Sequence, residues 1–499
     1  MKFKAILTMK LILILVMVFV SQAMAEKVIA KWTRTYNDAA NGDDRASGVA
    51  ADTSGNVYVT GYITGAGKDI WLRKYDASGN VVWTQTYNGT GNGDDIGSGV
   101  AVDSSGNVYV VGSVKTGTNS NIWLRKYDPN GTELWTREYD GASNGNDYGK
   151  AIAIDNQGNV NITGSEWVSG QGDNIWVRGY DPSGTVVWTR TYNDATNGND
   201  VGRGIATDMD GNVYVTGSVA GTGQDIWIGK YSGGFPCWTK SFDISGSDDC
   251  GYGIAVDGSY NIYVVGTITQ SGSTFLYRGS YSPNGIPLES TTYSGGDGNT
   301  AGYSMLLFHD TYIYVAGYET KTGGGTNTLV IKYPMSGEPI WVQTYNGTSN
   351  GDDVAMSIFV DSGENVYTAG YTTVSGQNSN IWVRKYLQGA AAEGEIIFLF
   401  DGLDCKIVGN KNGYVNPAAG EKVNFFYRTT EPGVVTFKVY NLRGELVKTL
   451  TANSTASEDP DRYEWNCLNE SEEVIASGIY VVKTEGPGLN VVKKFAIIK

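Results

Sequence analysis

Residues 97–112 read Gly-Ser-Gly-Val-Ala-Val-Asp-Ser-Ser-Gly-Asn-Val-Tyr-Val-Val-Gly. Two short apolar runs flank Asp-Ser-Ser-Gly, where the Asp can accept a local N–H and the Gly can adopt a left-handed conformation. This pattern predicts two antiparallel strands joined by a tight turn. Copies of the hairpin occur at residues 48–61, 99–112, 150–164, 204–217, 253–266, 304–317 and 357–370.

Two more predicted strands follow each hairpin. In the second copy they cover residues 121–127 and 134–139, with an Asp-Pro-Asn-Gly turn between them. A Trp in the last strand recurs every 50 to 53 residues, and Leu288 replaces it once. The strands are apolar or aromatic on both faces, as expected when each four-stranded sheet packs between two others. The repeat therefore predicts an all-β fold, a seven-bladed β-propeller with four-stranded blades.

The two ends of the repeat array predict how the ring closes. The array begins with a single strand of the Trp type at residues 29–36 and ends with a third strand at residues 381–386. The last blade therefore lacks its fourth strand. We expect the N-terminal strand to supply it, because this would remove the exposed edge of an open array.

The pattern Asp-Asp-x-Gly-x-Gly-Val-Ala-Val-Asp-x-x-Gly-Asn-Val-Tyr-Val-x-Gly at residues 94–112 resembles the bacterial SBBP repeat, a seven-bladed β-propeller repeat. The resemblance covers residues 29–386 through the recurring copies. It implies the fold, and it brings no reaction, cofactor or catalytic residue with it.

A different domain is predicted after a linker at residues 387–395. Residues 435–440 alternate between apolar and polar side chains, and further strands are expected at 423–430, 445–450, 477–485 and 490–498, which predicts a small antiparallel sandwich over residues 396–499. Residues 437–447, 476–480 and 493–499 resemble FlgD-like Ig-fold domains and type IX secretion C-terminal domains. The resemblance implies an Ig-like fold that serves as a spacer or a sorting signal.

Residues 1–25 have the features of a signal peptide. Lys2, Lys4 and Lys10 supply positive charge, residues 11–20 are apolar, and Ala-Met-Ala precedes Glu26. We expect cleavage there and a secreted or cell-surface monomer, residues 26–386 of which form the propeller, with no transmembrane segment. The net charge of −15 argues against a nucleic-acid partner, since phosphates require basic surfaces.

The loops between blades and between second and third strands are expected to share one face, which we call the loop face. The hairpin turns share the opposite face, which we call the hairpin face. Since loops on a rigid scaffold often carry function, we expect a protein or glycan partner at the loop face. Its candidate residues are Asp43, Asp44, Asp94, Asp95, Asp147, Asp200, Asp248, Asp249, Asp352, Asp353 and Trp167.

The acidic pairs of this face have two interpretations. Carboxylates suit Ca²⁺, for which Asp94, Asp95, Asp352 and Asp353 are candidates. Alternatively, each pair accepts backbone N–H groups where the chain crosses between blades. Repetition favours this second interpretation, because a site needs one special place whereas a joint is needed everywhere. We therefore expect no catalytic residue, and no cofactor other than Ca²⁺.

Two departures from the repeat and the four cysteines complete the set of candidates. His309 is the only histidine, and no nucleophile motif accompanies it, so we favour a decayed repeat over a catalytic base. Trp167 either stacks on a sugar or covers its own blade. Cys405 and Cys467 are better placed for a disulfide than Cys237 and Cys250, which we expect at opposite ends of their strands.

These patterns predict an exported, non-catalytic interaction or scaffold protein. The alternatives are an extracellular polysaccharide hydrolase or lyase that uses loop-face carboxylates, and a surface scaffold stabilised by calcium. Clustered acids with perturbed pKa values in only one or two blades would favour the enzyme.

Overall fold

The computed structural model describes residues 28–388 except 222, 296 and 297, and residues 405–408, 414–417, 422–441, 443–455 and 461–497. The predicted signal peptide and residues 389–395 of the predicted linker lie outside these residues. The described residues form two compact units. One comprises residues 28 and 33–388, and the other comprises the described residues from 405 to 497 together with residues 29–32, which belong to a strand paired with the first unit. No helix in the described part of the chain is long and apolar enough to cross a membrane.

The first unit consists of seven four-stranded antiparallel sheets. Six of them follow chain order, with strands β2 (Arg45–Ala51), β3 (Val57–Thr64), β4 (Lys68–Tyr75) and β5 (Val81–Tyr87); β6 (Ile96–Val102), β7 (Val108–Thr116), β8 (Asn119–Tyr127) and β9 (Glu133–Tyr139); β10 (Tyr148–Ile154), β11 (Val160–Val168), β12 (Gly172–Tyr180) and β13 (Val186–Tyr192); β14 (Val201–Thr207), β15 (Val213–Ala220), β16 (Gln224–Ser232) and β17 (Phe235–Phe242); β18 (Cys250–Val256), β19 (Ile262–Gln270), β20 (Ser273–Tyr281) and β21 (Pro287–Tyr293); and β22 (Thr300–Phe308), β23 (Tyr312–Thr320), β24 (Thr326–Pro334) and β25 (Trp341–Tyr345).

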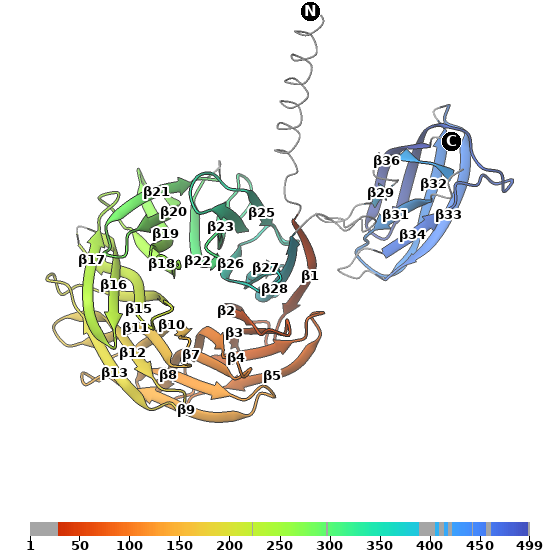
Figure 1. Ribbon diagram of the computed structural model, residues 1–499. Helices are drawn as coiled ribbons and strands as arrows, with labels where there is room; N and C mark the ends of the chain where they lie inside the picture. The colour runs from red at the N-terminus through yellow and green to blue at the C-terminus, as the bar shows by residue number, and fades with distance from the viewer. Residues whose placement is uncertain are drawn as a thin grey trace, which may run out of the picture. The chain divides into compact units, whose positions relative to one another are not determined.

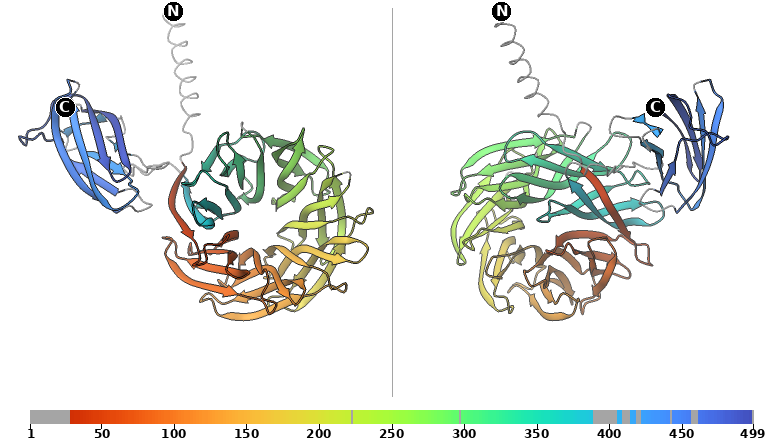
Figure 2. Two further views of the ribbon diagram at one scale, coloured as in Figure 1. Left: turned by 180° about the vertical axis from the view of Figure 1, so that it is seen from behind. Right: turned by 45° about the vertical axis from the view of Figure 1, so that its right-hand side comes forward.

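The seventh sheet joins the two ends of the unit. It contains β26 (Asp353–Val360), β27 (Val366–Val374), β28 (Asn378–Gln388) and, at its outer edge, β1 (Val28–Tyr36). Figures 1 and 2 show the sheets arranged around one axis, with the first strand of each sheet nearest to it. β28 extends to Gln388, so the first two residues of the predicted linker belong to a strand.

β1 contacts its own sheet and the next one. Arg384 of β28 donates a hydrogen bond to the Thr33 hydroxyl (2.8 Å), whereas the ring of Tyr36 stacks on Trp71 of β4 with 5.4 Å between centroids. Ring stacking of this kind recurs between successive sheets, as in Tyr87 with Trp123 at 5.2 Å. The sheets therefore pack through aromatic side chains buried on both faces, as the sequence pattern predicts.

The turns have the predicted chemistry. In the hairpin between β6 and β7, Asp103 accepts N–H groups from Ser105 and Asn107 at 2.9 Å, and Gly106 has a φ of 80°. Gly131 in the turn between β8 and β9 has a φ of 85°, as a left-handed glycine after a type I turn requires. An Asp-Met-Asp-Gly segment at residues 208–211 is likewise a turn, in which Asp208 accepts from Asp210 and Asn212.

The second unit contains two sheets. One has the order β29 (Cys405–Val408), β31 (Val423–Tyr427) and β34 (Asp461–Trp465). The other has the order β30 (Tyr414–Val415), β36 (Leu489–Ile497), β35 (Gly478–Gly486), β32 (Gly433–Asn441) and β33 (Leu446–Ser454). Both sheets contribute to one hydrophobic core, which includes Phe425 and Phe437.

The cysteine pairing expected in this unit is not formed. Cys405 and Cys467 both lie in the core, and Cys467 is a thiol rather than half of a disulfide. Burial raises the pKa of Cys467 to about 11. Cys237 and Cys250 of the first unit are not joined either, in agreement with their expected separation.

Candidate functional site

The first residue of each acidic pair ties its sheet to the preceding one. Asp94 accepts the backbone N–H of Lys68 from the preceding sheet, and the N–H of Asp95 returns a hydrogen bond of 2.7 Å to the Lys68 carbonyl. The same side-chain acceptor occurs at all seven crossings. It is supplied by Asp43, Asp94, Asn146, Asn199, Asp248, Asn299 and Asp352. At Asp43 the donor is Ser379 of β28, so the first and last sheets meet through the same contact as every other pair.

The second residue of each pair is buried and holds the crossing loop. Asp147 has no exposed surface and accepts N–H groups from Gly141 of the loop (2.5 Å) and Trp167 of β11 (2.9 Å). Five other aspartates repeat this arrangement, namely Asp44, Asp95, Asp200, Asp249 and Asp353. Thr300 replaces the aspartate in the remaining sheet and accepts from Leu276 at 2.9 Å. We call each such set of contacts a joint.

Burial raises the pKa of five of these carboxyl groups, although the N–H donors oppose the shift. The pKa of Asp147 rises to about 6, and those of Asp44, Asp95, Asp200 and Asp353 shift in the same direction. Perturbed acids thus occur at most crossings rather than in one or two sheets. Within the described residues, no group of three His, Cys, Asp or Glu side chains is placed to hold a metal ion. A calcium role for Asp94, Asp95, Asp352 and Asp353 stays a prediction.

Trp167 lies at the loop-face end of β11. Its side chain is 37% exposed, and its ring lies so close to Gly145 that a side chain on this glycine would collide with it. Trp167 therefore covers the crossing loop of its own sheet, as one of the two interpretations predicts. Because part of the ring stays exposed, its use as a sugar platform stays a prediction too.

His309 marks an altered turn in the sixth sheet. His309 and Asp310 have φ values of 48° and 50°, Thr311 donates to the Phe308 carbonyl, and Phe308 pairs with Tyr312, so the hairpin loop has three residues. The other six hairpins use a longer turn that begins with Asp and ends with Asn four residues later, with Gly before the Asn in four of them. His309 stacks on Phe308 with 4.1 Å between ring centroids. This arrangement agrees with the interpretation of a decayed repeat.

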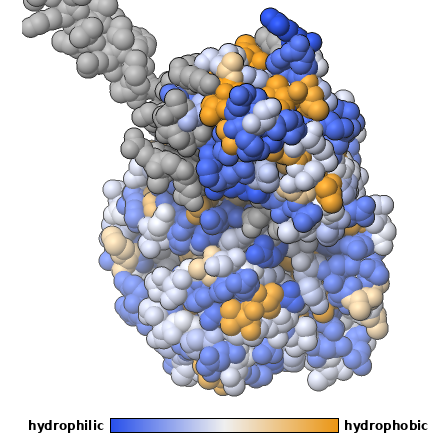
Figure 3. All heavy atoms as spheres, turned by 90° about the vertical axis from the view of Figure 1, so that its right-hand side faces the viewer, coloured by the Kyte–Doolittle hydropathy of each residue, from blue (hydrophilic) through white to orange (hydrophobic). Residues whose placement is uncertain are grey.

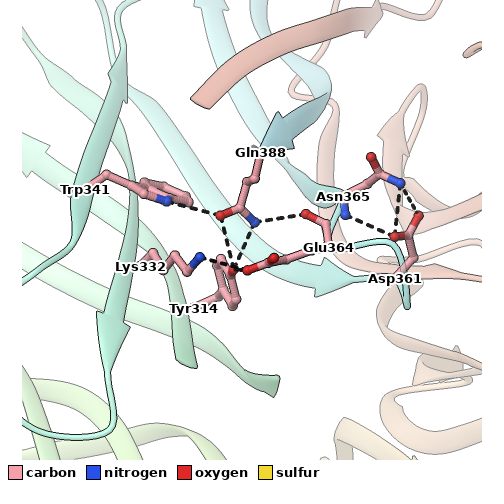
Figure 4. Close-up of polar contacts among 7 residues, drawn as sticks. All are labelled: Tyr314, Lys332, Trp341, Asp361, Glu364, Asn365 and Gln388. Carbon is pink, nitrogen blue, oxygen red and sulfur yellow. Dashed lines mark hydrogen bonds and ion pairs between the residues drawn. The ribbon is translucent and has the colours of Figure 1, made fainter. Parts of the chain in front are cut away.

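The altered turn removes an acceptor that a neighbouring sheet replaces. In other sheets a buried tyrosine donates to the turn aspartate, as Tyr367 does to Asp361 at 2.8 Å. In the sixth sheet Tyr314 donates instead to Glu364 of the next sheet at 2.5 Å, and Lys332 forms an ion pair with the same carboxylate at 2.7 Å. Figure 4 shows these groups converging with Gln388, which donates to the Glu364 carbonyl at 2.9 Å.

A group of residues that the sequence analysis did not single out lies near the axis. In every innermost strand the ladder register shifts at the same position of the repeat, and one residue forms a β-bulge. The bulge residues are Ser47, Ser98, Lys150, Arg203, Tyr252, Tyr303 and Met356. Bulges redirect a side chain and are frequent beside active sites. We call these seven residues the axial set.

The axial set differs from the joints because its members vary from sheet to sheet. Two serines lie on one side of the ring and two cations followed by two tyrosines on the other. The ring of Tyr252 lies 5.1 Å from that of Tyr303, and the Arg203 guanidinium carbon lies 5.2 Å from the Tyr252 centroid. The signal in the sequence was the variable residue between two small residues at the start of each hairpin.

Hydrophilic residues predominate on the side of the molecule that Figure 3 shows. Figure 3 shows one side of the molecule, where hydrophobic residues form separate spots. In the first unit, many of the exposed hydrophobic side chains recur near the start of outermost strands, among them Val81, Val82, Leu134, Val186, Val187, Phe235 and Leu288.

A family model for the SBBP β-propeller repeat matches residues 31–67, 82–121 and 187–218. These three segments of the chain match the SBBP β-propeller repeat. No curated protein matches it. This family match agrees with the resemblance inferred from the repeat motif.

Several solved structures are similar in fold. PorZ, a surface component of the type-IX secretion system of Porphyromonas gingivalis, is 14% identical with a TM-score of 0.42, over 89% of this chain and 58% of PorZ. The polysaccharide lyase Uly1 is 9% identical with a TM-score of 0.46, over 70% of this chain and 91% of the lyase. The propeller domain of the Trilobed protease from Pyrococcus furiosus is 12% identical with a TM-score of 0.42, over 70% and 98%. The chain thus spans little more than half of PorZ, and fold similarity at this level implies no shared activity.

Proposed function

We propose that this chain is an exported, non-catalytic interaction protein. In this proposal the first unit is a seven-bladed β-propeller that β1 closes, and its loop face binds a protein or glycan at the cell surface. The second unit is an Ig-like β-sandwich that acts as a spacer or sorting domain.

The observation that supports this proposal is the use made of the buried aspartates. In six of the seven sheets a buried carboxylate holds the loop that arrives from the preceding sheet, as Asp147 does with Gly141. A catalytic acid would be expected to differ from the equivalent residues of the other sheets. These aspartates instead make the same structural contact in each of the six sheets. The result is a rigid scaffold that presents loops of variable sequence, which favours binding.

A glycan array probed with the mature chain tests the proposal. A loop-face variant, Trp167→Ala combined with Asp248→Asn, is expected to lose the glycans bound by the parent protein. The matched hairpin-face variant, Val187→Ser combined with Asp76→Asn, should retain them. Binding that survives the first variant but not the second would contradict the proposed face. Release of shortened or unsaturated sugars from a bound glycan would favour the enzyme instead.

A further inference from the structure

Lys150 and Arg203 form no ion pair within the described residues, although the carboxylate of Asp173 lies near enough to act on Lys150. They are the bulge residues of neighbouring innermost strands, and both side chains are half-buried. Neither forms a hydrogen bond or ion pair with the part of the chain that the structure describes. The Arg203 Nε atom is buried and has no hydrogen-bond partner.

The two charges act on each other. Burial lowers the pKa of Lys150, the charge of Arg203 lowers it further, and Asp173 has the opposite effect. Two like charges held close together and half-buried destabilise a fold unless an opposite charge or a ligand compensates them. Such a pair is unexpected in a chain with a net charge of −15, and the equivalent positions in the first two sheets are the neutral Ser47 and Ser98.

The surroundings of the pair are aromatic and rich in hydroxyl groups. Arg203 lies over Tyr252, and the row continues through Tyr303 to Tyr318, whose ring centroid is 5.8 Å from that of Tyr303. Four of the seven members of the axial set carry a hydroxyl group, namely Ser47, Ser98, Tyr252 and Tyr303. Tyrosine offers a flat apolar ring and a hydrogen-bonding end, which suits a ligand with both kinds of surface.

We propose that Lys150 and Arg203 bind the carboxylate of an acidic sugar unit at the axis, with the tyrosine row against the sugar ring. Arginine matches a carboxylate with paired N–H donors, and lysine adds a point charge. The hydroxyl-rich set favours a sugar over a peptide carboxylate. The negative net charge of the chain disfavours a polyanionic ligand, but it allows a ligand with a single carboxylate to bind beside two cations. This site is separate from the outer loops, so it stands or falls independently of the function proposed above.

Calorimetric titration of the mature chain with glucuronate tests the proposal. Lys150→Gln and Arg203→Gln should each weaken binding about tenfold or more, because each removes a charged hydrogen bond. Lys240→Gln is the matched control, since Lys240 is an exposed cation on the outermost strand of the sheet that contains Arg203. It should leave binding unchanged. Glucose should not bind, and acetate should bind more weakly than glucuronate.

Three results would overturn the proposal. They are no binding of glucuronate, equal binding by the parent and both glutamine variants, and binding of acetate or of a peptide C-terminus as tight as that of glucuronate. Melting curves of the variants show whether each one is folded.

A second measurement needs no variant. Cys250 is half-buried beside Arg203 and Tyr252, whereas Cys237 is exposed. Glucuronate should slow alkylation of Cys250 by iodoacetamide several-fold and leave alkylation of Cys237 unchanged. Equal rates with and without glucuronate would contradict a ligand at this position.

Discussion

At the scale of single residues, the joints show how one carboxylate can fix several backbone groups. Asp95 is fully buried, and its two oxygens accept N–H groups from Gly89 and Lys115. Asp94 next to it is exposed and accepts one longer bond of 3.3 Å from Lys68. The two adjacent aspartates therefore contribute unequally to the stability of the fold.

Asp95→Ala is expected to lower the free energy of unfolding by about 2–4 kcal/mol, because it leaves two buried N–H groups without an acceptor. Asp94→Ala, the matched control, should have a much smaller effect, since water can replace its exposed carboxylate. Urea unfolding of the two variants measures the difference. Similar losses for both would show that burial of the second aspartate does not determine its contribution.

The raised pKa of Asp147 predicts a pH dependence of stability. The carboxyl has a pKa of about 6 in the folded chain and of about 3.9 when unfolded, so the folded state binds the proton more tightly. The stabilisation that comes from protonating the folded Asp147 carboxyl is complete below pH 4 and is lost as the pH rises through 6. The free energy of unfolding should therefore increase by about 1 kcal/mol between pH 7 and pH 5 from this group. Thermal melts of the parent and of Asp147→Asn test this, because the variant should lack that part of the increase.

At the scale of elements, the sixth sheet shows how a lost turn acceptor is replaced from outside. Lys332 has no exposed surface, and Glu364, in the turn between β26 and β27, lies 2.7 Å from it. Partial burial opposes ionisation of Glu364, but hydrogen bonds from Lys332 and Tyr314 hold its pKa below the ordinary value. The altered turn at His309 and the acid at residue 364 are therefore one feature spread over two sheets.

Glu364→Gln should lower the free energy of unfolding by about 2–3 kcal/mol, because a buried ammonium loses its counter-charge. Lys332→Met combined with Glu364→Gln should be less destabilised than the sum of the single changes. A double-mutant cycle from urea unfolding measures this coupling. Strict additivity of the two losses would mean that the ion pair contributes nothing.

β1 is the element on which closure depends. Deletion of residues 26–37 removes buried Val28 and the stacking of Tyr36, and it exposes the edge of β28. We expect a loss of at least about 5 kcal/mol, given about 1.5–3 kcal/mol for each buried side chain and the lost ladder. Tyr36→Ala, which keeps the strand, should lose much less. An unchanged unfolding transition for the deletion would refute the proposal that β1 closes the ring.

At the scale of the whole molecule, the sequence predicted most of the architecture. The repeat fixed the number of strands, their order and the turn chemistry because each copy constrains the others. It did not single out the axial set, because these residues differ in type from sheet to sheet, although each lies between two small residues at the same position of the repeat. Nor could it reveal that Glu364 compensates for the turn at His309. The hydrogen bond from Tyr314 to Glu364 joins residues 50 positions apart, in two different sheets. β29, β30 and β34 were also missed, because they are short and lack clean alternation.

The two units have separate cores, which predicts that they unfold separately. The core of the second unit is built from residues 405–497 alone, whereas Trp123 of β8 is buried among the sheets of the first. Calorimetry of the full chain should therefore show two transitions. Trp123→Ala should lower only one of them and Phe437→Ala only the other, each by about 3–5 kcal/mol, the usual loss for a buried aromatic residue. A single transition, or a shift of both by either variant, would mean that the units stabilise each other.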